Sequence, residues 1–67
     1  MYHVYMIRPI KNYELEDENI DYVFHDEKPY RRFLIESWYT EESAIHSTEN
    51  LNKFNSNNDR IYYYSKE

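Results

Sequence analysis

The chain has no cysteine in 67 residues, so neither disulfides nor thiolate metal sites can stabilise so small a fold. A domain of this length buries only about 60% of the surface that its unfolded chain exposes. It must therefore pack densely or rely on a partner. Nine Tyr, three Phe and one Trp supply rings that bury about 150–250 Å² each. We expect one domain, residues 1–67, with a core built largely from aromatic side chains.

Four segments have the composition and alternation of β-strands. Residues 2–10 carry apolar side chains on both faces, which predicts a central strand that ends near Pro9. Residues 21–25 and 31–39 flank the polar turn 26–29, where Pro29 fixes φ, and together they predict a hairpin. Residues 60–65 predict the last strand. In the third strand, strict alternation places Phe33, Ile35, Ser37 and Tyr39 on one face.

One helix is predicted over residues 41 to about 54. Thr40 is a good N-cap, and Glu41 and Glu42 lie in the first turn, where the helix dipole favours anions. The face expected to pack on the sheet is formed by Ala44, Thr48, Leu51 and Asn55, flanked by Ile45 and Phe54. The polar segment 55–59 should end the helix. The fold class is therefore α+β, in the order β-β-β-α-β, with one helix on one face of an antiparallel sheet.

Residues 12–27 contain seven acids and no Lys or Arg, and we expect a solvated loop over residues 11–19. One interpretation is a charged segment that only keeps a Tyr-rich chain in solution. Another is a surface that imitates the nucleic-acid backbone and binds a basic groove. Duplex DNA carries one charge per about 1.7 Å, so seven acids in one segment match it only in part. The spacing does not follow a calcium loop, so we expect no metal. The candidate acids are Glu14, Glu16, Asp17, Glu18, Asp21, Asp26 and Glu27.

The tyrosines form a second candidate surface, because a single helix cannot cover both faces of a four-stranded sheet. Tyr, Trp and Arg are common anchors of protein interfaces. The predicted patch combines Trp38 with Arg31, Arg32 and neighbouring tyrosines. The predicted anchors are Tyr30, Trp38, Tyr62 and Tyr64. Two alternatives stay open: a homo-oligomer that buries the Tyr-rich face, and a single-strand nucleic-acid binder, which a net charge of −5 disfavours.

Catalytic motifs are not recognisable in the sequence. His3, His25 and His46 have no metal-ligand spacing, and the chain has no glycine from which to build a phosphate loop. We expect no enzyme activity and no cofactor. The absence of glycine, with many Asn, Tyr and Lys, is typical of AT-rich genomes.

From these features we expect a non-catalytic binding module, acting in the cytoplasm. We expect it to be an accessory protein of a phage or mobile element. The expected partner is a host protein, either a nucleic-acid-handling enzyme or a defence complex, whose basic groove the acids would occupy. Direct binding to nucleic acid or to a membrane is not expected.

Overall fold

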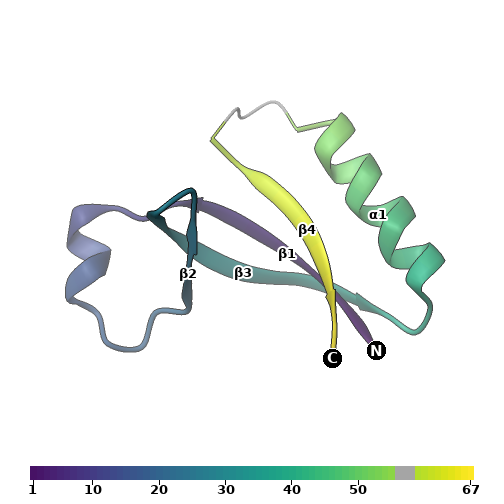
Figure 1. Ribbon diagram of the computed structural model, residues 1–67, viewed down its shortest axis with the longest axis horizontal. Coiled ribbons are helices and arrows are strands. Elements are labelled where there is room, and N and C mark those ends of the chain that lie inside the picture. Colours follow the sequence, from purple (N-terminus) through teal and green to yellow (C-terminus); the bar gives the residue numbers. More distant parts are fainter. Residues whose placement is uncertain (56–58) are drawn as a thin grey trace.

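The computed structural model describes residues 1–55 and 59–67, which form a four-stranded antiparallel sheet with one α-helix packed against it (Figure 1). The strands lie in the order β2-β3-β1-β4. This arrangement confirms the predicted α+β fold. The elements are β1 (Tyr2–Pro9), a 3-10 helix η1 (Asn12–Glu16), β2 (Tyr22–His25), β3 (Lys28–Trp38), α1 (Glu41–Lys53) and β4 (Ile61–Lys66).

β1 is a central strand, as its two apolar faces predicted. It pairs with β3 along one side and with β4 along the other. Val4 and Met6 are buried on the face that α1 covers, and Ile7 is buried on the opposite face. Burying one such side chain contributes about 1.5–3 kcal/mol, so β1 holds much of the small core.

The face assignment of β3 was wrong, because the strand contains a β-bulge. Val4 is opposite Glu36 but Tyr5 is opposite Leu34, so Ile35 is an extra residue in β3. A bulge of this kind shifts the alternation of all the residues beyond it. As a result Phe33, Glu36 and Trp38 share the face of β1 that carries Met6, Val4 and Tyr2.

The hairpin between β2 and β3 is confirmed, but its turn is shorter than predicted. Only Asp26 and Glu27 form the turn, and both have positive φ, 51° and 66°. This is the backbone of the type I′ turn that suits the twist of a tight hairpin. Lys28 and Pro29 already belong to β3, and the Pro29 carbonyl accepts a hydrogen bond from the Ile10 N–H at 3.3 Å.

α1 begins where the sequence predicted, because the Thr40 hydroxyl accepts a hydrogen bond from the Ser43 N–H at 3.2 Å. Ala44 is fully buried and Leu51 is half-buried. Phe54 does not flank the packed face as expected, since its side chain is 76% exposed. The helix ends at Lys53. Within the segment predicted to end it, residues 56–58 lie outside the described part of the chain.

The segment predicted as a solvated loop contains the 3-10 helix η1. Its Glu14 side chain reaches Arg8, which shares a face of β1 with Met6. η1 and α1 therefore lie on the same face of the sheet, at opposite ends of the molecule (Figure 1).

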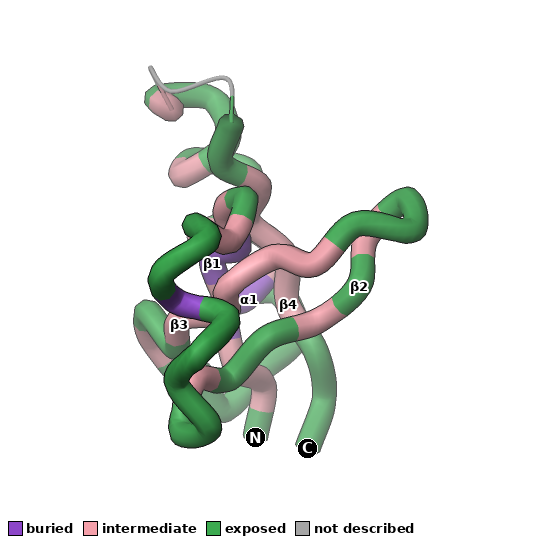
Figure 2. The backbone as a smooth tube through the Cα atoms, turned by 90° about the vertical axis from the view of Figure 1, so that its left-hand side faces the viewer, coloured by how far each residue is buried: buried purple, intermediate pink, exposed green. Residues whose placement is uncertain are grey.

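Burial is concentrated at the centre of the sheet, whereas the tip of the β2–β3 hairpin is exposed (Figure 2). Within residues 1–55 and 59–67, no helix has the length and apolar character needed to cross a membrane.

Candidate docking surfaces

Glu14, one of the candidate partner-binding acids, is buried in an ion-pair cluster. Only 2% of the residue is exposed. Arg8 Nη1 and Nη2 donate to its Oε1 and Oε2 at 2.8 and 3.0 Å, and Arg31 Nη1 donates to Oε2. The Lys11 backbone N–H donates to Oε1 at 3.0 Å. Glu14 therefore fastens η1 to the sheet and is not available to a partner.

Two guanidinium groups surround the single carboxylate of Glu14. The hydrogen bond from Arg8, together with those from Lys11 and Arg31, lowers the pKa of Glu14 from its ordinary value of 4.5 to about 2. The guanidinium groups of Arg8 and Arg31 also lie over the Phe33 ring, at 5.3 and 4.8 Å from its centroid. The cluster therefore combines one carboxylate, two guanidinium groups and a ring.

Asp21 is the second candidate acid that is already paired. Arg32 Nε donates to Asp21 Oδ2 at 2.8 Å. The Arg32 guanidinium also lies over the Tyr5 ring at 4.5 Å, and Tyr5 stacks on Tyr63 with centroids 5.5 Å apart. Arg32 pairs with Ile7 on the face away from α1, whereas Arg31 pairs with Arg8 on the α1 face. The predicted patch of Trp38, Arg31 and Arg32 is therefore not assembled.

The five remaining candidate acids are exposed and lie around η1 and β2. They are Glu16, Asp17, Glu18, Asp26 and Glu27. Asp17 Oδ1 accepts a hydrogen bond from the Asn19 N–H at 2.9 Å, which orders the turn after η1. The Asp26 carboxylate lies 3.5 Å from the His25 ring nitrogen. These carboxylates face solvent at both ends of β2, where Figure 1 shows the η1 loop and the hairpin turn.

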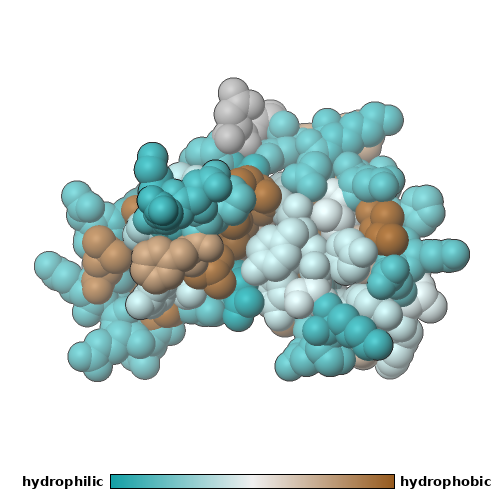
Figure 3. Space-filling view, in the orientation of Figure 1, coloured by the Kyte–Doolittle hydropathy of each residue, from teal (hydrophilic) through white to brown (hydrophobic). Residues whose placement is uncertain are grey.

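Large apolar side chains are exposed among these acids. Leu15 is 57% exposed, Tyr22 52% and Phe24 70%. The Tyr22 and Phe24 rings meet edge to face at 5.9 Å, and with Leu15 and neighbouring apolar residues they line a hollow of about 170 Å³. Figure 3 shows apolar side chains gathered over this end of the molecule, with hydrophilic ones around them. We name Leu15, Tyr22, Phe24 and the five exposed acids the η1–β2 surface.

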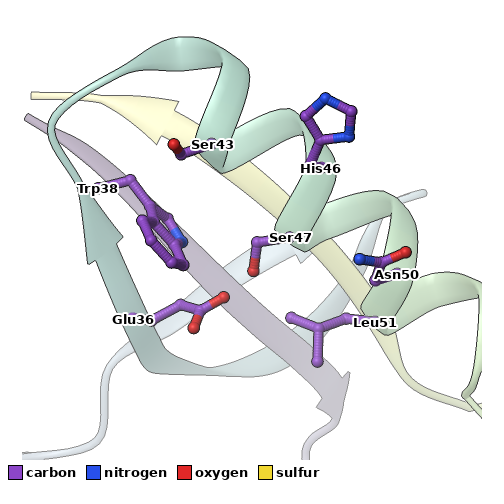
Figure 4. Close-up of a pocket in the computed structure, with 7 residues that line it drawn as sticks. All are labelled: Glu36, Trp38, Ser43, His46, Ser47, Asn50 and Leu51. Atoms are coloured by element: carbon purple, nitrogen blue, oxygen red, sulfur yellow. The ribbon is translucent and has the colours of Figure 1, made fainter.

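Trp38 lies in a separate groove between β3 and α1. The groove has a volume of about 440 Å³ and is lined by Glu36, Trp38, Ser43, His46, Ser47, Asn50 and Leu51. In Figure 4, Trp38, Glu36, Ser47 and Leu51 converge, whereas His46 points away from Trp38 and Glu36. The Ser43 hydroxyl accepts a hydrogen bond from the Thr40 hydroxyl at 2.9 Å. This arrangement does not place a serine against the histidine as a nucleophile and base require.

The other predicted anchors are distributed over both faces. Tyr62 and Tyr64 pair with Met6 and Val4, so they lie half-buried on the α1 face. Tyr30 contacts the His25 ring edge to face at 5.4 Å, near the hairpin. Of the predicted anchors, only Tyr30 lies at the end of the molecule that carries the acids. Trp38, Tyr62 and Tyr64 lie toward α1.

Sequence reasoning did not select Leu15, Tyr22 or Phe24 as candidate site residues. A signal was present, because these apolar side chains lie within the acidic segment 12–27 and Tyr22 and Phe24 alternate on one side of a strand. Their exposure follows from the edge position of β2, which local sequence does not specify.

Within the described ranges, no group of three or more His, Asp or Glu side chains is arranged to hold a metal ion. What the structure assembles is a pair of separate surfaces, one apolar and acid-rimmed at η1 and β2, the other a groove between β3 and α1. Comparison of the chain with protein-family models, with curated proteins and with solved structures gave no match.

Proposed function

We propose that this protein is a non-catalytic binding module that inhibits a nucleic-acid-handling protein by occupying its basic groove. The observation that carries the proposal is the η1–β2 surface, where exposed apolar side chains are surrounded by five exposed carboxylates. The apolar centre supplies buried area on binding, and the acids match a basic rim.

The charge of this surface suits a short stretch of a basic groove. Two of the seven acids in residues 12–27, Glu14 and Asp21, are paired with arginines within the fold. The longest dimension of the molecule is 36 Å. Duplex DNA of that length carries about twenty charges, at one per 1.7 Å. The contact therefore relies on the apolar centre for affinity and on the acids for orientation and encounter rate.

The two alternative functions have less support in the geometry. A single-strand nucleic-acid binder built on Arg31 and Arg32 needs these guanidinium groups free beside exposed rings. Here Arg31 and Arg32 are both paired with carboxylates, and Tyr5 and Tyr63 stack on each other. A Tyr-mediated homodimer would depend on the same face, where Tyr5 and Tyr63 already contact each other.

Capture from cell lysate at low salt tests the proposal. The immobilised protein should retain nucleic-acid-binding proteins, and double-stranded DNA should displace them more completely than salt of equal ionic strength. The variant Glu16→Gln/Asp17→Asn/Glu18→Gln should lose this capture. The matched control Glu41→Gln/Glu42→Gln/Glu49→Gln removes three exposed charges from α1 and should keep it.

Association rates test the same variants more directly than capture does. With a captured protein in surface plasmon resonance, neutralising the η1–β2 acids should slow association by about tenfold or more at low salt and flatten its salt dependence. The α1 control should associate as the wild type does. Equal association rates for the two triple variants, or capture that DNA does not displace, would contradict the proposed function.

A further inference from the structure

β2 is an edge strand whose outer backbone groups are unpaired. The Arg32 N–H donates to the Asp21 carbonyl at 2.9 Å, so the backbone of Asp21 faces β3. Because strand residues alternate, the N–H and C=O groups of Tyr22 and Phe24 point away from β3. No described residue hydrogen-bonds to these groups, and no described strand lies beyond β2.

The opposite edge of the sheet, along β4, is capped by side-chain amides where that strand begins. The Tyr62 N–H donates to Asn52 Oδ1 at 3.1 Å, and Asn52 Nδ2 donates to the Tyr62 carbonyl at 3.0 Å. Asn55 Nδ2 donates to the Arg60 carbonyl at 2.8 Å. Side-chain amides from α1 and the residues after it thus take the place of a neighbouring strand at the start of β4, whereas no such cap covers β2.

β2 is short, at four residues, but it lacks three of the features that protect an edge strand from pairing. Tyr22–His25 contains no Lys, no Pro and no bulge, and it carries Tyr22 and Phe24 exposed beside the apolar hollow. A strand added here would continue the sheet and lay alternate side chains over the hollow.

We propose that the edge of β2 binds an extended, lysine- or arginine-rich segment of the partner protein as a fifth strand. This inference rests on the proposed function and specifies how its surface engages a partner. The carboxylates at the two ends of β2 define the chemistry, since Asp17 and Glu18 precede the strand and Asp26 and Glu27 follow it. An incoming strand with basic side chains meets opposite charge at both ends.

The same charges disfavour a second copy of this chain as the added strand. Pairing of β2 with β2, in either direction, brings the acids at the ends of one strand against acids of the other. Like charges in such positions destabilise strand pairing. The partner segment is therefore basic rather than a copy of β2.

The test uses the peptide acetyl-(Lys-Val)₅-amide and 15N-labelled protein in low salt. We expect saturable binding, with the amide protons of Tyr22 and Phe24 exchanging at least about tenfold more slowly with the peptide present. The control peptide has the same sequence with every backbone nitrogen methylated, which keeps the charge and removes the donors. It should not slow exchange at these residues.

Variants at Phe24 separate backbone from side-chain contributions. The Phe24 N–H points to solvent, so Phe24→Pro removes an outer donor without removing a bond to β3. We expect Phe24→Pro to weaken peptide binding about tenfold more than Phe24→Ala, which keeps the N–H. If Phe24→Pro does not fold, the methylated peptide makes the same comparison on the unaltered protein.

The outcomes of these experiments separate strand addition at β2 from the proposed function. Equal binding of the methylated peptide overturns strand addition and leaves the acidic η1–β2 surface of the proposed function intact. Strand addition is also overturned if the unmethylated peptide does not bind the wild type. Protection of Tyr22 and Phe24 that rises with protein concentration alone would overturn the basic partner segment and identify a second copy as the occupant. Strand addition without any DNA-displaceable partner would instead contradict the proposed function while supporting this inference.

Discussion

Arg8 and Glu14 are joined at both oxygens, with Nη1 2.8 Å from Oε1 and Nη2 3.0 Å from Oε2. This pair attaches η1 to β1, and Arg31 extends the attachment to β3. The position of Leu15, and with it one side of the apolar hollow, depends on the attachment. The most buried acid of the chain therefore supports the η1–β2 surface without belonging to it.

Replacing Glu14 by Gln should destabilise the fold more than replacing any other single acid of residues 12–27. The substitution leaves two arginines without their shared carboxylate, and unpaired charges at a buried site are costly. Glu16→Gln changes an exposed acid of the same helix and is the matched control, for which we expect a change within about 0.5 kcal/mol. Urea denaturation measures both. A Glu14→Gln variant as stable as Glu16→Gln would show that the cluster does not hold η1.

The stability of the protein should fall in acid because of Glu14. Its pKa is about 2 in the folded state and near 4.5 when unpaired. A lowered carboxyl pKa stabilises the fold above pH 4.5, and that contribution is lost as the pH falls from 4.5 toward 2. Denaturation series over this range should show a shallower pH dependence for Glu14→Gln than for the wild type. Parallel curves would mean that Glu14 does not titrate as the ion pairs require.

Glu27→Gly should stabilise the protein by up to about 1 kcal/mol. Glu27 has φ of 66°, a left-handed conformation that glycine adopts without the steric cost of a Cβ. Glu27→Ala removes the same charge but keeps the Cβ, so it should bring no such gain. Thermal unfolding compares the three proteins. If the alanine variant gains as much as the glycine variant, then relief of charge repulsion, and not backbone geometry, is the cause.

Asn52→Ala should destabilise the protein by about 1–3 kcal/mol. The change removes two hydrogen bonds to the Tyr62 backbone, each contributing about 0.5–1.5 kcal/mol. It should also raise the exchange rate of the Tyr62 amide proton. Asn50→Ala removes a nearby exposed amide of α1 and should have little effect on either measurement. Unchanged protection at Tyr62 in Asn52→Ala would contradict the capping of β4 by Asn52.

Thr40→Ala should cost about 0.5–2 kcal/mol, because the Ser43 N–H loses its acceptor at the start of α1. Thr40→Ser keeps the hydroxyl and should stay close to the wild type. Helical circular dichroism and thermal unfolding measure the two variants. Equal losses in both would point to the threonine methyl group instead of the cap.

The elements of the fold were predictable because their signals are local. The N-cap at Thr40, the apolar faces of β1 and the hairpin before β3 can each be recognised within a few residues. The bulge at Ile35 was not predictable, since it arises from pairing with β1 about thirty residues away. For the same reason the sequence did not indicate that β2 is an edge.

The acidic residues show the same limit of prediction from local sequence. Glu14 and Asp21 are no different in sequence from Glu16 or Asp17, yet they are paired with Arg8, Arg31 and Arg32 across the sheet. Composition predicted an acidic surface. Only the tertiary arrangement shows which carboxylates remain free and that exposed apolar side chains lie among them.

Hydrogen exchange of the protein with and without a captured partner tests the central claim most directly. The account predicts slower exchange in η1 and β2, greatest at Tyr22 and Phe24, with α1 and the groove around Trp38 unchanged. Protection of Trp38 and α1 with no change in β2 would contradict it and would place the docking surface between β3 and α1.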